Sequence, residues 1–284
     1  MQDFNGKVAF VTGGASGIGY ALAEAFGNAG MKVMIAGPNQ NTLDAAIAQL
    51  AESGVNAKSV KCDVSKRADI EHAAQQTIAA YGKVHILCNN AGVGVMGEIG
   101  EVATSDWDWV IDVNIKGVIH GTEIFAPLIA SHGEGGHINT TASMAALMCH
   151  PGGEPYSATK YAVVAMTEGW RVQLAPKNIG VSVAFPGPVR TKMNESYRNR
   201  PGGFIRRPIT EEVEATFARI NELGQPPRMY AARVLEGIVT CTPAQRATAM
   251  PAAARSAAPR GCSRLSIVPS LCTKGSTHWR KILK

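Results

Sequence analysis

The stretch Val8-Ala9-Phe10-Val11-Thr12-Gly13-Gly14-Ala15-Ser16-Gly17-Ile18-Gly19 decides the fold class. A continuously apolar run leads into a turn that carries spaced glycines, and a helical pattern follows over residues 20–26. Glycines allow a tight turn and a close approach of a pyrophosphate, and the first turn of a helix offers free N–H groups. A glycine-rich turn alone is weak evidence, because any tight turn needs glycine. Its position after the first strand favours the phosphate cradle of a nucleotide-binding βαβ unit.

Strand and helix patterns alternate through the chain after this unit. We expect strands at residues 7–12, 32–37, 57–62, 84–88, 136–141 and 180–185, and helices at 17–29, 42–53, 69–81, 105–132 and 155–175. Strands that alternate with helices at this spacing predict an α/β fold, with a single doubly wound parallel sheet of Rossmann type flanked by helices. We therefore expect one domain over residues 1–239, including a Gly/Pro-rich mobile substrate lid at about 188–228, followed by a distinct tail at 240–284.

Composition is typical of a soluble globular enzyme. The 284 residues are 45% hydrophobic and 18% charged. Because no apolar run approaches the roughly 18 residues of a membrane span and the N-terminus lacks a signal-peptide pattern, we expect a cytoplasmic protein without membrane contact. The six cysteines have no metal-type spacing, so we expect free thiols and no metal site.

The net charge of +6 comes from the tail. Residues 240–284 hold eight Lys and Arg and no acid, which leaves 20 basic and 22 acidic residues elsewhere. Binding to nucleic acid would depend on the tail alone, which lacks aromatic interleaving and any binding motif. We do not expect a nucleic-acid partner.

The end of the second strand bears on cofactor preference. An acidic residue that holds the adenosine ribose usually stands there, but this chain has Gly37. Its loss removes a repulsion against the 2′-phosphate of NADP. No arginine replaces it, and Ser16 occupies a turn position that is often basic in NADP enzymes. The pattern favours NADP, with NAD as the alternative. Asp63, at the end of the third strand, is placed either to meet the adenine or to form a turn.

A chemical constellation follows the fifth strand. Tyr156 and Lys160 lie four residues apart at the start of a helix and share a face. An ammonium beside a phenol favours the phenolate, which would bring the pKa of Tyr156 toward neutrality for acid/base work on a carbonyl–alcohol pair. Ser143 follows the fifth strand, where its hydroxyl can donate to the substrate oxygen. Asn114 is a poor residue for the middle of a helix unless its side chain or a local kink has a purpose.

Taken together, these motifs resemble the short-chain dehydrogenase/reductase family. The resemblance covers about residues 4–195 and rests on TGxxxGIG (12–19), NNAG (89–92), the helix asparagine, the serine, YxxxK and PGxVxT (186–191). It implies Tyr156 as acid/base, Lys160 as the residue that lowers its pKa and binds the nicotinamide ribose, Ser143 as the residue that orients the carbonyl, and Asn114 as support for a water-linked proton relay. The cofactor residues it implies are Gly13, Ser16, Gly17, Ile18, Gly19, Gly37, Asp63, Val64, Asn90, Ala91, Gly92, Tyr156, Lys160, Pro186, Gly187, Val189 and Thr191.

The resemblance also locates the substrate pocket, in the loops after the fourth strand, after the serine and after PGxVxT. The expected substrate contacts are Val95, Met96, Met144, Met148 and Met193, which indicate an apolar, adaptable pocket. The alternative for each methionine is ordinary core packing. The segment 96–112 is similar to family members that act on aryl alcohols and lignin-type Cα-hydroxyls.

The tail departs from the family pattern. We expect one helix at 211–223 and a second at 229–239. Family members normally have a final strand after a helix such as the second one. The only strand-like run in the tail is 265–268. Our hypothesis is that the tail is out of family register, for instance through a shifted reading frame, and partly disordered. A missing last strand would expose the sheet edge and weaken the contacts of the expected homodimer or homotetramer.

The sequence thus predicts an NAD(P)-dependent oxidoreductase that interconverts a secondary alcohol and a ketone, with a small-molecule substrate. The alternative is a cofactor-binding sensor or scaffold on the same fold, with little or no turnover.

Overall fold

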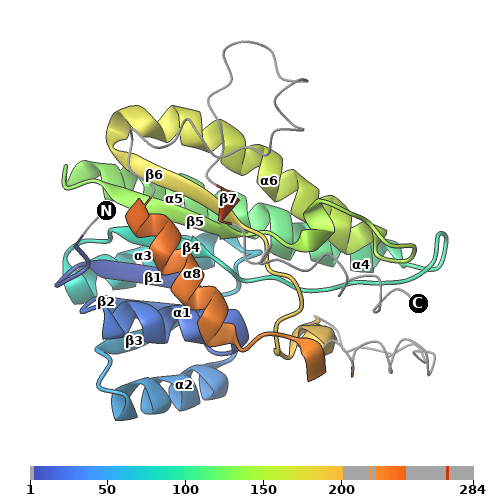
Figure 1. The fold of residues 1–284 in the computed structure, drawn as a ribbon, viewed down its shortest axis with the longest axis horizontal. Helices are drawn as coiled ribbons and strands as arrows, with labels where there is room; N and C mark the ends of the chain where they lie inside the picture. The colour runs from blue at the N-terminus through green and yellow to red at the C-terminus, as the bar shows by residue number, and fades with distance from the viewer. Residues whose placement is uncertain (1–2, 201–217, 219–221, 241–266, 269–284) are drawn as a thin grey trace.

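The computed structural model describes residues 3–200, 218, 222–240 and 267–268. Within them, seven parallel strands form one sheet in the order β3-β2-β1-β4-β5-β6-β7 (Figure 1). The strands are β1 (Val8–Thr12), β2 (Lys32–Gly37), β3 (Ala57–Lys61), β4 (Ile86–Asn89), β5 (Gly136–Thr141), β6 (Ile179–Ala184) and β7 (Ile267–Val268). The strand order reverses between β1 and β4, which places a ligand crevice at their carboxyl ends. The expected doubly wound sheet is confirmed.

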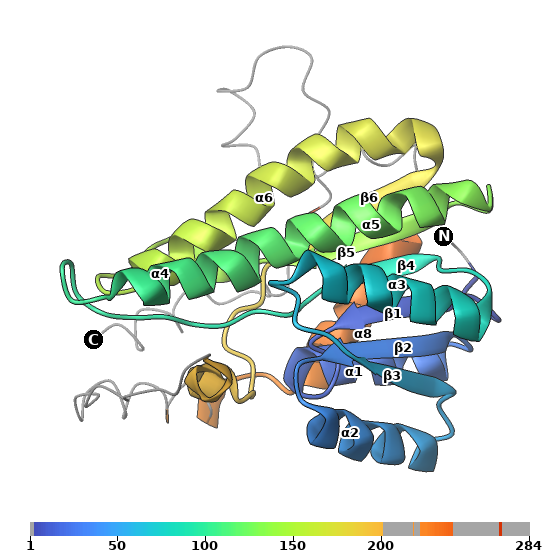
Figure 2. The ribbon, with the colours of Figure 1, turned by 180° about the vertical axis from the view of Figure 1, so that it is seen from behind.

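Helices cover both faces of the sheet. One face carries α1 (Gly17–Asn28), α2 (Gln40–Glu52) and α8 (Pro227–Thr240), as Figure 1 shows. The other face, toward the viewer in Figure 2, carries α3 (Arg67–Tyr81), α4 (Thr104–Ile111), α5 (Gly117–Ser131) and α6 (Glu154–Leu174). Short 3₁₀ turns are η2 (Met144–Ala146), η3 (Ala175–Lys177) and η4 (Met193–Asn199). No helix in these described parts is long and apolar enough to cross a membrane.

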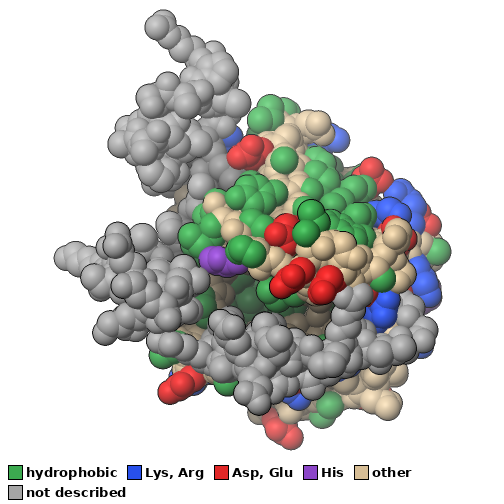
Figure 3. Space-filling view, turned by 90° about the vertical axis from the view of Figure 1, so that its right-hand side faces the viewer, with side chains coloured by type: hydrophobic (Ala, Val, Ile, Leu, Met, Phe, Trp, Pro, Cys, Tyr) green, Lys and Arg blue, Asp and Glu red, His purple; other side chains and the backbone are tan. Residues whose placement is uncertain are grey.

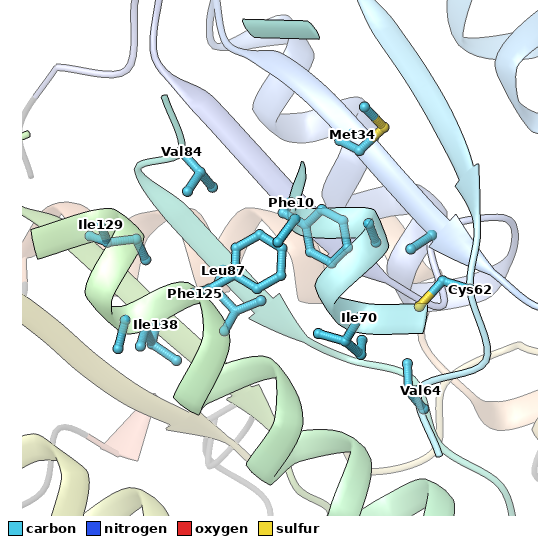
Figure 4. Close-up of a cluster of buried hydrophobic side chains, with 14 of the residues drawn as sticks. Phe10, Met34, Cys62, Val64, Ile70, Val84, Leu87, Phe125, Ile129 and Ile138 are labelled. Carbon is cyan, nitrogen blue, oxygen red and sulfur yellow. The ribbon is translucent and has the colours of Figure 1, made fainter. Parts of the chain in front are cut away.

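The core explains why the deciding stretch begins with four apolar residues, Val8–Val11. Phe10 points toward α3 and α5, where its ring stacks on Phe125 with centroids 4.3 Å apart (Figure 4). Ala9 and Val11 point to the opposite face and pack beneath α1 and α8. All five residues of β1 are buried. Because a parallel strand that is covered on both faces has no side exposed to water, a polar side chain at any of its positions loses its hydration.

The expectation of a single helix over residues 105–132 is wrong in one respect. The chain leaves α4 through a π-turn, η1 (Asp112–Lys116), before α5 begins. A π-turn accommodates one extra residue per turn, so it rotates the side chains that follow. Asn114 lies in this π-turn and is fully buried, which supplies the local kink that an asparagine at this position suggested.

The C-terminal part matches the expectations where it is described. Helix α8 confirms the helix expected at 229–239, whereas most of the helix expected at 211–223 lies outside the described residues. Within the strand-like run 265–268, Ile267 and Val268 pair with Val183 and Ala184 as β7. A final strand is therefore present, although only two residues of it are described. The remaining positions of the 240–284 tail lie outside the described residues.

Candidate active site

Thr12, the last residue of β1, ties the first strand to the loop after β4. Its hydroxyl accepts hydrogen bonds from the backbone N–H groups of Asn90 (2.9 Å) and Ala91 (3.0 Å), and donates to the carbonyl of Cys88. The Asn90 side-chain amide donates to the Thr12 carbonyl at 3.0 Å. Asn90 and Ala91 are thus held at the crevice, as expected for residues that line a cofactor.

The glycine-rich turn forms a tight entry to α1. Gly13 and Gly17 have positive φ angles of 65° and 55°. A Cβ at Gly19 would stand 2.1 Å from the Gly13 carbonyl oxygen, so no larger residue fits there. Ser16 caps α1 without a side-chain hydrogen bond, and the first turn contains no acid. The first N–H groups of α1 therefore stay available to an anion, and this arrangement fits the pyrophosphate of a dinucleotide.

Gly37 and Asp63 are the two residues that we expect at the adenosine end of the crevice. A Cβ at Gly37 would meet only the Leu43 side chain, at 3.7 Å, so the site has room for a larger group. The Asp63 carboxylate accepts hydrogen bonds from the backbone N–H and hydroxyl of Ser65. Asp63 thus forms the expected turn through Oδ1, and its contact with the adenine stays a prediction. The side chain of Val64 is buried in the core, while its carbonyl oxygen lies 3.1 Å from His120 Nδ1.

The other expected cofactor residues come from three loops. Ile18 packs partly against the core, and a Cβ at Gly92 would stand 3.3 Å from Asn114 Oδ1 and 3.4 Å from Lys160 Nζ. The PGxVxT loop approaches the glycine-rich turn, since a Cβ at Gly17 would stand 3.0 Å from Thr191 Cγ2. In that loop Pro186 is buried, Gly187 is half-buried, and Val189 bridges to Gln225.

Asn114 uses its whole side chain to hold the loop after β4. Its Oδ1 accepts from the Val93 N–H at 2.8 Å, and its Nδ2 donates to the Val93 carbonyl and to Thr159 Oγ1, both at 3.0 Å. The Thr159 hydroxyl in turn donates to the Tyr156 carbonyl at 2.7 Å. The π-turn, the post-β4 loop and the start of α6 are thereby fixed to one another.

Tyr156, Lys160 and Ser143 converge at the carboxyl end of β5. The Ser143 side chain lies beside the Tyr156 phenol and lowers the pKa of that phenol. Lys160 Nζ lies 5.6 Å from the centroid of the Tyr156 ring and donates to the Thr141 carbonyl at 3.0 Å. Lys160 is only 3% exposed. A hydroxyl, a phenol and a buried amine thus lie close together, with Ser143 and Tyr156 partly exposed.

Burial dominates the protonation of this group. It raises the pKa of Tyr156, and the Ser143 hydrogen bond opposes that rise only in part. The same desolvation lowers the pKa of Lys160 to about 8. In the chain by itself, desolvation thus disfavours the charged form of both residues. The role of Lys160 in lowering the Tyr156 pKa stays a prediction.

The expected substrate residues separate into two groups. Met96 and Met148 are 58% and 46% exposed. Val95 and Met144 pack partly against the core, as the alternative allowed, and Met193 is half-buried at the start of η4. Figure 3 shows hydrophobic side chains gathered on the end of the molecule where α4 lies, with acidic side chains beside them.

The described part of the expected lid is anchored. The buried Ser196 hydroxyl accepts from the Gly94 N–H at 2.9 Å. Arg200 pairs with Asp106 at 2.6 Å and donates to Ser105 Oγ. Residues 193–200 are thus attached to the loop after β4 and to the start of α4, and the mobile lid stays a prediction. Residues 201–217 lie outside the described part.

Three contributors escaped the sequence reasoning. Thr12 was seen only as part of a glycine motif, and Thr159 only as a spacer between Tyr156 and Lys160. Tyr230, on α8, is 1% exposed, and the Thr141 side chain lies beside its hydroxyl. In the sequence, Tyr230 differs from its neighbours only as a residue with a polar hydroxyl at an apolar position of a helix. Its surroundings become known only from the folded chain.

Comparisons with known proteins agree with this geometry. Residues 7–202 match the family described as short chain dehydrogenase. A C alpha-dehydrogenase from Sphingobium is 35% identical over 244 residues, which cover 84% of this chain and 79% of that protein. 3beta-Hydroxysteroid dehydrogenase 2 from Eggerthella lenta is 35% identical over 196 residues, or 68% of this chain and 75% of that protein.

A solved structure adds direct evidence for the cofactor class. A short-chain dehydrogenase/reductase from Burkholderia phymatum, in complex with NAD, superimposes with a TM-score of 0.80 at 35% identity, covering 85% of this chain and 88% of that one. The chain therefore belongs to the short-chain dehydrogenase/reductase family, as an oxidoreductase that acts on CH–OH groups with a nicotinamide cofactor.

Proposed function

We propose that this chain interconverts a secondary alcohol and a ketone, with Tyr156 as the acid/base that moves the proton of the substrate oxygen. The observation that supports this role most strongly is that the Tyr156 phenol lies beside the Ser143 side chain and near the buried Lys160 Nζ at the carboxyl end of β5. Ser143 orients the substrate oxygen by donating a hydrogen bond. Lys160 favours the phenolate whenever it is protonated, and its pKa of about 8 places that protonation near working pH.

The cofactor assignment extends this proposal to the crevice. When bound, a nicotinamide cofactor supplies or accepts the hydride at the carbinol carbon. We assign its pyrophosphate to the first turn of α1 and its nicotinamide half to Asn90, Lys160 and the PGxVxT loop. The open space at Gly37 supports a preference for NADP, and NAD is the alternative.

Asn114 positions the site. Both polar atoms of its side chain are occupied by Val93 and Thr159. The water-linked proton relay proposed at Asn114 therefore requires its backbone carbonyl. The side chain holds the surrounding loop and the start of α6 in place.

The first test is Tyr156→Phe. Loss of the phenolic hydroxyl should reduce turnover of a ketone or secondary alcohol by about 10²–10⁴-fold, the usual contribution of general acid–base catalysis, while cofactor binding followed by fluorescence stays intact. Tyr161→Phe, an exposed tyrosine on the same helix, is the matched control. Full activity in Tyr156→Phe would refute the mechanism.

Cofactor preference has its own measurement. Titration of the purified chain with NADPH and NADH, following ligand fluorescence, should show tighter binding of NADPH. Tighter binding of NADH would overturn the NADP assignment and leave the proton chemistry untouched.

We further propose an apolar secondary alcohol or its ketone as substrate. Exposed Met96, Ile99, Leu147 and Met148 on the neighbouring loops support this class, as do relatives named for a Cα-dehydrogenase and a hydroxysteroid dehydrogenase. Initial rates across aryl and alicyclic ketones, compared with short polar ones, test it: equal rates for polar substrates would contradict it.

Assembly and location complete the proposal. Tyr161 and Val172 leave apolar side chains of α6 exposed, at 47% and 61%, which supports a homodimer or homotetramer. Light scattering of the purified chain tests this assembly. Buried free thiols at Cys62 and Cys88 are compatible with the cytoplasm. A sensor or scaffold without turnover is not favoured, because relatives in the family are named as dehydrogenases and reductases.

A further inference from the structure

We propose that the pocket beside the glycine-rich turn has a cationic wall, in which Arg190, Lys192 and Arg228 bind the pyrophosphate of the cofactor. The motifs specify none of these three residues, since Arg190 stands at a variable position of PGxVxT (186–191) and the other two lie outside it. The inference rests on the proposed function, because it concerns a dinucleotide, but inorganic pyrophosphate tests the pocket without one.

The pocket has a volume of about 420 Å³ and opens between three parts of the chain. Small-molecule sites in proteins usually have about 300–1,000 Å³. Its walls are the first half of α1, the end of the PGxVxT loop and the start of α8. Ser16, Gly17 and Thr191, which are expected cofactor residues, line it together with the three cations. The pocket is therefore continuous with the crevice that is assigned to the cofactor.

Cations outnumber acids in the lining of the pocket. The side chains of Arg190, Lys192 and Arg228 are exposed, and Glu24 is the one acid among the described residues of the lining. Glu24 stands eight residues after Ser16 on α1, which places it about 12 Å further along the helix axis. The acid thus lies away from the glycine-rich turn, and the lining carries a surplus of positive charge.

These three cations lack the partners that neighbouring arginines have. In the described part of the chain, none of the three side chains has an ion pair or a hydrogen bond. By contrast, Arg198 pairs with Glu195 at 2.9 Å, and Arg233 pairs with Glu236 at 2.9 Å. The positive charge at the pocket is therefore not neutralised by nearby carboxylates and is available to an anion.

The first turn of α1 adds hydrogen-bond donors to this charge. Ser16 makes no side-chain cap, and the turn contains no acid. A hollow that is lined by one sign of charge concentrates the potential, and the arginine guanidinium matches the oxygens of a phosphate in pairs. Donors at one wall and cations at the others suit a pyrophosphate, which carries a negative charge on each phosphate.

Backbone hydrogen bonds fix the cationic walls to each other. The Arg190 N–H donates to the Gln225 carbonyl at 3.0 Å, and the Gln225 N–H donates to the Pro188 carbonyl at 3.0 Å. This bridge joins the PGxVxT loop to the segment that leads into α8, and α8 packs against α1. The walls that carry Arg190 and Arg228 are thus held in place before any ligand binds, which reduces the cost of ordering them around an anion.

The position of the pocket selects the pyrophosphate over the 2′-phosphate of NADP. Gly37, at the adenosine end of the crevice, does not line it, whereas Gly17 and Thr191 do. The pyrophosphate is common to NADH and NADPH. We therefore expect the three cations to strengthen the binding of both dinucleotides by the same factor and to leave the preference between them unchanged.

The first test compares two exposed arginines of α8 by titration with NADH and with NADPH at low salt, following ligand fluorescence. Arg228→Gln should weaken the binding of both dinucleotides about 1.5- to 5-fold, the usual effect of one exposed ion pair. Arg233→Gln is the matched control, because it removes the same charge from the same helix outside the pocket. It should leave both affinities unchanged. No loss in Arg228→Gln, an equal loss in the control, or a loss for NADPH alone would overturn the proposal.

The second test uses salt and a free anion. The triple variant Arg190→Gln/Lys192→Gln/Arg228→Gln should bind both dinucleotides roughly tenfold more weakly at low salt, as the product of three such losses. The deficit should shrink near 1 M NaCl, where the screening length falls from about 10 Å at 0.1 M to about 3 Å. A deficit that does not change with salt would contradict the electrostatic role.

Inorganic pyrophosphate is the probe that does not depend on a dinucleotide. Calorimetric titration should show that it binds the wild-type chain, that NADH displaces it, and that the triple variant binds it roughly tenfold more weakly. Absence of binding, or equal binding by both chains, would overturn the proposal. If the wild-type chain binds neither NADH nor NADPH, the proposed function fails, and the comparison of pyrophosphate binding by the two chains still decides whether the cations form an anion site.

Discussion

Asn114→Ala tests whether the side chain of the π-turn holds the active site together. In the folded chain its amide satisfies both the N–H and the carbonyl of Val93, which is 5% exposed. Truncation leaves two buried backbone groups without a partner. Thr159 is affected less, because its hydroxyl keeps the bond it donates to the Tyr156 carbonyl.

Asn139 supplies a control of the same residue type and burial. It is also 0% exposed, but its Nδ2 makes one bond, to Ser182 Oγ at 2.9 Å, and its Oδ1 has no partner among the described residues. Asn139→Ala leaves Ser182 bonded to His137 at 2.8 Å. Both substitutions remove the same atoms, so their cavity costs are similar and the difference isolates the polar groups. At about 1–3 kcal/mol for each of the two orphaned Val93 groups, Asn114→Ala should cost about 2–6 kcal/mol more than Asn139→Ala.

The assay is urea unfolding of the full chain, with the midpoint and slope fitted for each variant. In thermal unfolding, a difference of 2 kcal/mol corresponds to about 4–8 °C in Tm for a domain of this size. Equal destabilisation by the two substitutions would refute the reasoning, since it would mean that Val93 finds other partners and that the π-turn asparagine does not hold the loop.

Three further predictions concern the cofactor, acid stability and the lid. Gly37→Asp should weaken NADPH binding at least tenfold, about 1.4 kcal/mol, and strengthen NADH binding, because a carboxylate repels the 2′-phosphate and holds a ribose; fluorescence titration measures both, with Gly37→Ala as control. Burial lowers the pKa of His85, so the unfolded chain takes up a proton near pH 6.5 that the folded chain does not, and the free energy of unfolding should fall as pH drops through 6.5. Hydrogen bonds from Lys83 and His85 lower the pKa of Glu134 to about 2, so the stability that Glu134 contributes is present above pH 4.5 and is lost as pH falls toward 2. To test the His85 effect, urea unfolding of His85→Gln should show a smaller decrease in the free energy of unfolding between pH 7 and 5 than the unmodified chain. An unchanged decrease would contradict the assignment to His85. Ser196→Ala removes the partner of a backbone N–H in the loop after β4, so proteolytic cleavage within 193–200 should become several-fold faster; unchanged cleavage would show that the anchor is dispensable.

The fold was predictable because strand patterns alternate with helix patterns along the chain, and because the first strand is a mostly apolar run. The run at 8–12 is apolar because Phe10 and Val11 face opposite layers, and both layers are covered. The positions of Asn90, Ser143 and Tyr156 followed from the same logic, since the carboxyl ends of parallel strands share one edge. These predictions depend on local pattern alone, which is why they held.

The π-turn could not be read in the same way. One extra residue in a helix changes the periodicity too little to detect within a run of 28 residues, and apolar residues continue on both sides of Asn114. The only hint was the asparagine itself, a residue that a helix interior tolerates poorly. Its three partners are backbone and side-chain groups 21 and 45 positions away, so its purpose appears only in the folded chain.

The protonation of Tyr156 shows where sequence reasoning fails for a physical cause. A lysine four residues away was expected to favour the phenolate, and the spacing does place it nearby. The burial that brings the two side chains together also removes the water that would support their charges, so it raises one pKa and lowers the other. The spacing of Tyr156 and Lys160 along the helix indicates the attraction between their charges, but it carries no information about this desolvation. An acid/base pair of this kind depends on the hydrogen bonds that replace the lost water, and for Lys160 that bond is to Thr141.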